Sequence, residues 1–271
     1  MLGKLIKHDF RATWKVTVPI DALLIVLGII AAFVLHVMPH VSDSVGMSLF
    51  TFGLVGLFYI GIIAANVVTL IFLVIRYYRN LYTAEGYLTF TLPVKTDMII
   101  HSKVITGAVW MFLSYLCTFI SLVIAGTGLA SSLNVSREEI FEGFHEVFSF
   151  LGFADPGFVA ILLFLILLTP VAGIVCMYFC VSIGQLWQNH KILGSVLCVI
   201  GLYIFNQLVS QVVFFASGFW RLMASSGAEI DATFGVFYKN VMLNLGILTF
   251  IEAVIYYIVC IIITRRKINL D

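Results

Sequence analysis

The sequence predicts an all-α polytopic membrane protein with six transmembrane helices. Of its 271 residues, 62% are hydrophobic and 11% are charged, and the mean hydropathy is +1.11. A soluble domain could not bury this much apolar surface, nor could so few charges cover it. The apolar runs are continuous and each is long enough to cross a bilayer core of about 30 Å, whereas β-barrel strands would alternate with a period of two.

We expect a single transmembrane domain over residues 16–271. Its six spans are predicted near 16–38, 47–75, 104–130, 157–183, 192–217 and 240–263. The basic residues cluster at the ends of these runs and form no continuous stripe, so nucleic acid is not an expected partner.

The basic residues also predict an orientation. Twelve of the fifteen Lys and Arg residues fall on one side of the predicted spans: Lys4, Lys7, Arg11, Lys15, Arg76, Arg79, Lys95, Lys103, Lys191, Arg265, Arg266 and Lys267. The other side has Arg137, Arg221 and Lys239. By the positive-inside rule, both termini are expected in the cytoplasm of a cell whose plasma membrane holds the protein.

Residues 1–15 are predicted to form an amphipathic helix at the membrane interface. Its apolar side carries Leu2, Leu5, Ile6 and Phe10. The lysines would then face anionic lipid headgroups, while a helical cytoplasmic stub is the alternative. Thr17 is the expected N-cap of the first span. Asp21 would then lie near the start of that helix, where an acid interacts favourably with the positive end of the helix dipole. We therefore interpret Asp21 as a helix-start residue and not as a buried functional acid.

Residues 82–96 join the second and third spans and contain EGYLTFTLPVKT, which is too polar to span and too apolar for a free loop. Thr83 is expected to cap a short helix that Pro93 ends, and Thr96 to start the third span. This short helix would lie across the cytoplasmic mouth of the protein and expose Tyr87, Leu88 and Phe90. Either a soluble protein or the membrane surface would have to cover these side chains.

Two further connections have recognisable patterns. Residues 136–152 combine a capping-box pair, Ser136 and Glu139, with an apolar face, which predicts a short extracellular amphipathic helix. The connection between the fifth and sixth spans mixes aromatic and small residues, which suits a partly re-entrant segment covered by protein.

Five polar residues lie inside the predicted spans and are candidates to line a cavity. They are Asn206, Gln207, Ser210, Gln211 and Glu252. On the fifth span, Asn206 and Ser210 are i, i+4 neighbours, as are Gln207 and Gln211. These side chains would either hydrogen-bond neighbouring helices or line a water-filled path. A charged acid at the position of Glu252 would cost about 3 kcal/mol, so it must be protonated, paired or hydrated.

No enzyme signature is present. The sequence lacks HExxH, GxSxG and GxxxxGK[ST] motifs, and Glu252 has no second acid in its span for acid/base chemistry. The five cysteines all lie in predicted spans, so we expect neither an extracellular disulfide framework nor a metal site. Any nucleotide hydrolysis would have to occur in another chain.

The order of these features resembles the membrane subunit of type-2 ATP-binding-cassette exporters, as found in Clostridium-like bacteria. The resemblance covers nearly the whole chain, and the EGYLTFTLPV stretch is its most specific part. It implies that residues 82–96 form a coupling helix that docks on a separate ATPase subunit. The implied docking residues are Glu85, Gly86, Tyr87, Leu88 and Phe90.

The resemblance also implies a complex of two permeases, alike or homologous, and two ATPases, with the transport cavity between the permeases. ATP and magnesium would bind in the ATPase partner, and this chain would hold no cofactor. The uncharged spans favour an amphipathic or hydrophobic cargo such as a peptide. Two alternatives are a self-sufficient channel or secondary transporter that uses Glu252, although no inverted repeat is evident, and a membrane sensor or scaffold.

Overall fold

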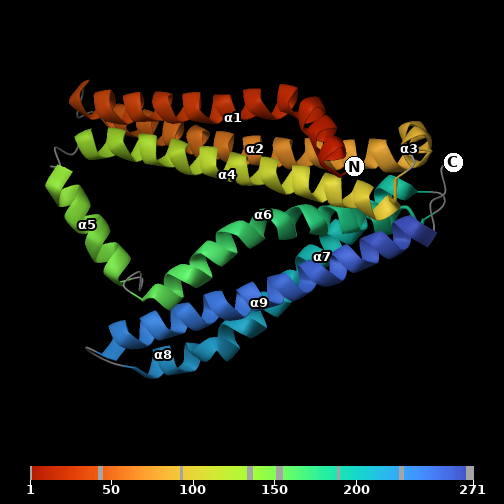
Figure 1. Cartoon of the computed structure of the whole chain (residues 1–271). Coiled ribbons are helices and arrows are strands. Elements are labelled where there is room, and N and C mark those ends of the chain that lie inside the picture. Colours follow the sequence, from red (N-terminus) through yellow and green to blue (C-terminus); the bar gives the residue numbers. More distant parts are fainter. Residues whose placement is uncertain are drawn as a thin grey trace. The chain divides into compact units, whose positions relative to one another are not determined.

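The computed structural model describes residues 2–41, 45–91, 94–132, 137–150, 155–187, 190–225 and 229–266. These residues are helical almost throughout, and none of them forms a strand. The helices are α1 (Leu2–Val41), α2 (Val45–Tyr82), α3 (Ala84–Phe90), α4 (Thr96–Ser132), α5 (Arg137–Phe150), α6 (Pro156–Gly184), α7 (Lys191–Phe214), the π-turn η1 (Phe215–Phe219), α8 (Trp220–Ala224) and α9 (Glu229–Arg266) (Figure 1).

Six of these helices are long and apolar enough to cross a membrane, namely α1, α2, α4, α6, α7 with its continuation through α8, and α9. They contain the six predicted spans, and every one begins or ends beyond the predicted limits. The difference arises because hydropathy marks the part that fits a bilayer core, while the backbone hydrogen bonds continue into polar sequence. The helix α3 and the helix α5 also occur where short helices were expected, but their predicted surroundings remain predictions.

The chain packs as two compact units. The α1 unit comprises residues 3–73 and 106–144, and the α9 unit comprises residues 1–2, 74–105 and 145–271. Helices α2 and α4 contribute residues to both units, so the single six-helix domain stays a prediction.

In the α1 unit, α1 and α4 approach each other at small residues. A Cβ atom on Gly28 would lie 2.5 Å from Ser121 Oγ, and one on Gly128 would collide with the Ala32 backbone. Ser121 uses this closeness to donate a hydrogen bond to the carbonyl of Leu24 at 2.8 Å. Small residues at such a contact let two backbones come close enough to pack and bond inside a membrane.

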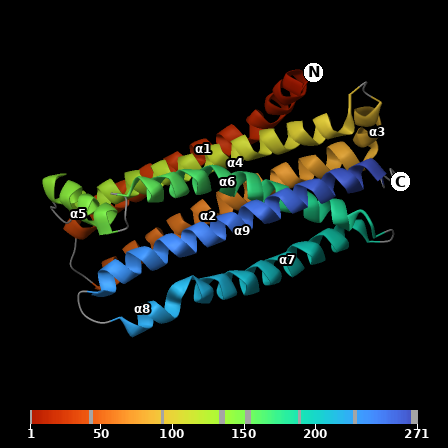
Figure 2. The same cartoon turned by 60° about the horizontal axis from the view of Figure 1, so that its bottom comes forward.

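The helix α1 does not begin at Thr17, contrary to the sequence prediction. It runs without a break from Leu2 to Val41, and the Thr17 hydroxyl donates to the Thr13 carbonyl one turn earlier. The helix bends near its N-terminal end in Figures 1 and 2. Pro19 lies within α1, where it has no amide hydrogen to donate to the carbonyl of Lys15.

Two residues near the start of α1 therefore have other roles than expected. Asp21 is not a helix-start residue, because it lies inside α1 and is buried with 7% of its surface exposed. Phe10, which was expected on a lipid-facing side, packs against Trp110 of α4 with ring centroids 5.6 Å apart. The N-terminal segment thus contacts protein within its own unit.

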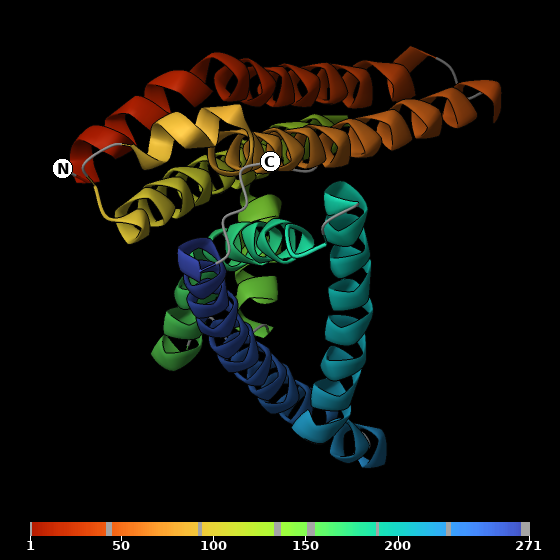
Figure 3. The same cartoon turned by 90° about the vertical axis from the view of Figure 1, so that its right-hand side faces the viewer.

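In the α9 unit, α6 packs against both α7 and α9. The buried core between them contains Val175, Phe179, Cys180 and Tyr256, with the Phe179 and Tyr256 rings stacked at 4.6 Å. In Figure 3, α7 (teal) and α9 (dark blue) converge at the end that carries α8. The α6 residues of this core all lie after Pro170 in the chain.

The end of this unit near α8 is helical with one break. Gly218 has a φ of +111°, a conformation that glycine adopts readily because it lacks a Cβ atom. Ser217 accepts a hydrogen bond from Asn244 of α9 at 3.0 Å, and the Phe214 and Phe237 rings meet edge to face. The described part of this connection is thus a bent continuation of α7 followed by the long α9, and a re-entrant course through the membrane stays a prediction.

Asp155 caps α6 at the same end. It accepts from the Gly157 amide at 2.8 Å and pairs with Lys239 of α9. The Lys239 ammonium, together with the Gly157 amide, holds the pKa of Asp155 below its usual range. Because both side chains are well exposed, this pair orients the helix ends more than it stabilises them.

Replacing Gly128 by Ala should destabilise the protein because the new methyl group would collide with the backbone of α1. Overpacking of this kind costs about 1–3 kcal/mol. Thermal unfolding in lipid nanodiscs measures the effect, and Gly126→Ala on the same helix is the matched control because nothing lies within 4 Å of its added Cβ. Equal unfolding temperatures for the two variants would contradict the packing described.

Candidate functional site

The helix α3 begins sharply after α2. Thr83 separates them with an extended backbone (φ −118°, ψ −172°), and its carbonyl accepts from the Gly86 amide at 2.7 Å. Thr83 occupies the predicted N-cap position, but its side chain makes no capping bond because the hydroxyl donates to the Arg79 carbonyl at 2.6 Å. Thr83 therefore closes α2 and lets the chain turn into α3.

Side-chain contacts connect α3 to both long helices beside it. Glu85 of α3 pairs with Arg79 of α2 at 2.9 Å. With its amide nitrogen toward Glu85, Asn80 donates to this carboxylate at 3.0 Å and accepts from Lys103 of α4 at 2.8 Å. Each exposed contact is weak, but together they link three helices through one carboxylate and one amide.

A buried cluster of hydroxyl and thiol groups holds the end of α2 from which α3 departs. We call it the hydroxyl cluster, and its members are Tyr77, Tyr82, Ser182, Cys260 and Thr264. Ser182 of α6 lies 2.9 Å from the Tyr82 hydroxyl, 3.2 Å from that of Tyr77 and 3.3 Å from the Cys260 sulfur. The Tyr82 hydroxyl also lies 3.2 Å from that of Thr264 on α9.

The hydroxyl cluster satisfies its polar groups internally. Ser182 donates to the Tyr178 carbonyl at 2.8 Å, which leaves its oxygen able to accept from a tyrosine. Tyr77 stacks on Tyr178 with ring centroids 3.9 Å apart and planes within 7° of parallel. The last turn of α2 is therefore fixed to α6 and α9 by directional contacts.

The start of α4 is also attached to α9. Arg265 donates from Nε to Asp97 at 2.7 Å and makes a second contact through its other nitrogen, so the pair is bidentate. The Tyr257 hydroxyl contacts the His101 ring one turn further along α4. Both helices that flank α3 are thus bound to the same core.

The predicted docking residues differ in their exposure. Tyr87 is 64% exposed, and Glu85 is exposed although paired with Arg79. Gly86 is buried, so it offers no surface to a partner in this structure. The side chains of Leu88 and Phe90 lie outside the described residues, as do Pro93 and the whole of Ser136.

The polar residues of the fifth span divide between two directions. Asn206 is half-buried and bonds to Tyr256 of α9, while Gln207 and Gln211 are exposed. Ser210 is half-buried. The predicted stripe is therefore two features, one facing the core of the unit and the other facing away from it.

Glu252 lies one turn before Tyr256 on α9 and is half-buried. It lies near Cys176 of α6, and the thiol groups of Cys176, Cys180 and Cys198 (the last on α7) are close enough to hydrogen-bond. All three are free cysteines. In the described part of the chain, however, no group of three or more His, Cys, Asp or Glu residues has the geometry to hold a metal ion.

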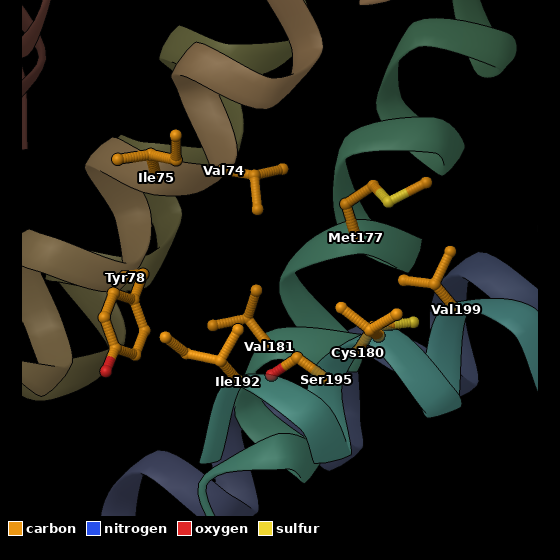
Figure 4. A pocket seen from close by; sticks show the side chains of 10 residues that line it. Val74, Ile75, Tyr78, Met177, Cys180, Val181, Ile192, Ser195 and Val199 are labelled. Carbon is orange, nitrogen blue, oxygen red and sulfur yellow. The ribbon is translucent and has the colours of Figure 1, made fainter. Parts of the chain in front are cut away.

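An apolar cavity of about 250 Å³ lies between α2, α6 and α7 (Figure 4). Its lining residues are Val74, Ile75, Tyr78, Met177, Cys180, Val181, Ile192, Ser195, Val196 and Val199. None of the five predicted cavity residues is among them. The cavity expected between two permease chains is a different space and stays a prediction.

Sequence reasoning missed the hydroxyl cluster. A signal was available, because all five residues fall at the same end of their predicted spans once the chain is threaded back and forth across a membrane. Cys260 and Thr264 are also i, i+4 neighbours. These residues come together because α2, α6 and α9 are neighbours in the structure. Hydropathy does not predict which helices are neighbours.

Ser182→Ala should destabilise the protein by about 1 kcal/mol, because it removes the hydroxyl that Tyr77 and Tyr82 share and leaves them only Cys260 and Thr264 as partners. The unfolding temperature in nanodiscs measures this loss. Thr249→Val is the control, since the Thr249 hydroxyl donates within its own helix to Leu245. If Ser182→Ala were no more destabilising than Thr249→Val, the hydroxyl cluster would not hold these helices together.

The comparisons with known proteins add no relative: the chain matches no family model, no curated protein and no solved structure.

Proposed function

We propose that this chain is the permease subunit of an ATP-driven exporter of the ATP-binding-cassette class. In this proposal it lies in the plasma membrane with both termini in the cytoplasm. A separate ATPase subunit, present in two copies, hydrolyses ATP with magnesium. The chain itself performs no catalysis.

The observation that carries the proposal is the position and attachment of α3. It is a seven-residue helix between two long helices, and it presents Tyr87 outward while Glu85 and Asn80 fix its base to α2 and α4. An exposed aromatic residue on a rigid short helix suits a docking element, because little ordering entropy is lost when a partner binds. Of the two covers expected for this helix, a soluble ATPase is the one we propose.

The attachments of α3 also supply a route for force. Closure of the ATPase would push α3, and the hydroxyl cluster would pass the movement from Tyr82 to α6 and α9. The Arg265–Asp97 pair would make α4 follow α9. Rigid-body rocking of helices that are joined in this way is an established form of conformational switching.

The exposure of helix α7 favours the presence of a second permease subunit. In its most apolar window 6% of residues are buried, against 22–33% in the other five spans. Its exposed surface includes Gln207, Gln211 and Tyr203, the last with 69% of its surface exposed. Hydrocarbon cannot hydrogen-bond the glutamine amides, so another protein surface is the favourable cover.

The proposed cargo is amphipathic or hydrophobic, with a peptide as the first candidate. The support for this cargo is that the predicted spans carry few charged residues, so a cavity between two such chains would offer few partners to a charged cargo.

Changing Tyr87 and Leu88 together to Asp should abolish recovery of the ATPase subunit when the chain is purified from its native membrane. Buried carboxylates at a docking surface would be desolvated without a partner. Quantitative mass spectrometry of the purified complex measures the recovery.

Phe141→Asp is the matched control, because Phe141 is an aromatic residue of another short helix and is 73% exposed. This variant should retain the ATPase. Failure to recover an ATPase with the wild-type chain, or equal recovery with the Tyr87/Leu88 variant, would overturn the proposed function.

A further inference from the structure

The first half of α1 carries a buried polar row. Asp9, Thr13, Thr17 and Asp21 follow one another at four-residue intervals, and they are 4%, 1%, 0% and 7% exposed. This spacing places them on one face of the helix. The row starts near the N-terminal end of α1 and ends at Asp21, inside the apolar part of the helix.

Helix α4 supplies polar partners along this row. Trp110 donates from Nε1 to the Thr13 hydroxyl at 2.7 Å, and Ser114 donates to Asp21 Oδ1 at 2.6 Å. The Thr17 hydroxyl, between these two contacts, donates to the Thr13 carbonyl at 3.3 Å. Asp9 and Asp21 are therefore the ends of a row of buried polar side chains, in which the Thr13 and Thr17 hydroxyls donate to backbone carbonyls of α1.

Near Ser114, some buried polar groups of the α1 unit have no hydrogen-bond partner among the described residues. Thr118, one turn beyond Ser114, donates to the Ser114 carbonyl and accepts from Asn66 of α2, each at 2.9 Å. Among the described residues, Asn66 Oδ1 and the fully buried Thr69 hydroxyl on the next turn of α2 have no hydrogen-bond partner. Buried polar atoms left in this state are where an ordered water or an ion is expected.

Among the described residues of the α1 unit, Asp21 is bonded by Ser114 and is paired with no basic side chain. The parts of α2 and α4 in this unit, residues 45–73 and 106–132, contain no Lys, Arg, His, Asp or Glu, and their titratable groups are Tyr59, Tyr115 and Cys117. On α1 the nearest basic residue is Lys15, which is exposed. Asp9 is the other acid of the row.

An ionised carboxylate in these surroundings would be a bare charge in a low-dielectric region, which is strongly unfavourable. Ser114 donates one hydrogen bond, and this is weaker compensation than a cation would give. The charge of the carboxylate can instead be neutralised by a bound cation. A proton is the simplest such cation, because it needs no ligands beyond the carboxylate oxygen. A sodium ion would require several converging oxygens.

We propose that Asp21, held by Ser114, is an exchangeable proton-binding site inside the membrane, and that the row from Asp9 through Thr13 and Thr17 is its route to water. Asp21 gains the proton on a carboxylate oxygen, and the Ser114 hydroxyl bonds to the acid in either state. The inference is independent of the proposed exporter function, because the docking helix α3 belongs to the other unit.

Infrared spectroscopy of the full chain in nanodiscs tests the site through the carbonyl stretch of protonated carboxyl groups. Between about pH 5 and pH 9, a range that covers documented buried carboxyls, this band should lose intensity as the pH rises. The titrating component should be absent from Asp21→Asn and present in Glu252→Gln, which removes the other acid deep in a span. Replacing sodium by choline should leave the titration unchanged.

Three outcomes would overturn the proposal. They are an Asp21 component that is absent at every pH, one that is present at every pH without exchange, and a titration that requires sodium. The second would mean a permanently neutral residue that bonds α1 to α4. If Asp21→Asn does not fold, Ser114→Ala decides, because loss of its hydrogen bond should shift the frequency of the same component, and an unchanged frequency would exclude Asp21 as its source.

Thr17→Val tests the route. It removes the hydroxyl between Thr13 and Asp21 and preserves the side-chain shape. The Asp21 component should remain, but its shift after transfer to heavy water should be several times slower than in the wild-type chain. Thr127→Val on α4 is the control, since the Thr127 hydroxyl is exposed and donates to its own helix. Equal exchange rates in the two variants would contradict the route.

Discussion

Hydrocarbon offers no hydrogen-bond partner to a polar side chain, and this constraint governs how the helices of this protein are arranged. Many of the polar groups within its spans are bonded to one another, and they are gathered in two places. Ser182 and its tyrosines are bonded in the α9 unit, and Asp21 and Ser114 in the α1 unit. Apolar surface decides that helices form, while these few polar contacts decide which helix meets which.

The same constraint connects the candidate functional features. The hydroxyl cluster ends at Tyr82, directly before the turn into α3, so a buried polar cluster adjoins a short helix that exposes Tyr87. Gln207 and Gln211 remain exposed, and in the proposed function a second permease subunit covers them. The helices next to α3 are thus held by many side-chain contacts, whereas most of α7 is exposed.

The sequence was sufficient to predict the six apolar helices, because a bilayer demands long continuous hydrophobic runs and leaves few alternatives. It also predicted a helix near Glu85 and another near Glu139. It misplaced the start of the first helix, since the weak capping preference of Thr17 was outweighed by continuous backbone hydrogen bonding from Leu2 onward. The capping pattern at Thr17 predicted Asp21 as a helix-start residue, whereas Asp21 lies inside α1 and accepts a hydrogen bond from Ser114, 93 positions away in the chain.

The candidate site was predicted in part for the same physical reason. The exposed side of α3 follows from local sequence, but the burial of Gly86 and the division of Asn206 from Gln207 depend on neighbouring helices. The i, i+4 row from Asp9 to Asp21 was visible in the sequence and would have indicated a polar helix face. What it bonds to depends on α4, whose lateral position hydropathy does not specify.

Native mass spectrometry of the chain released from lipid nanodiscs most directly tests the claim that unsatisfied polar surface in the membrane is covered by protein. The account predicts two copies of the chain, and easier dissociation when Gln207 and Gln211 are both changed to Leu. A wild-type chain that is monomeric and free of any other protein in the bilayer would contradict it.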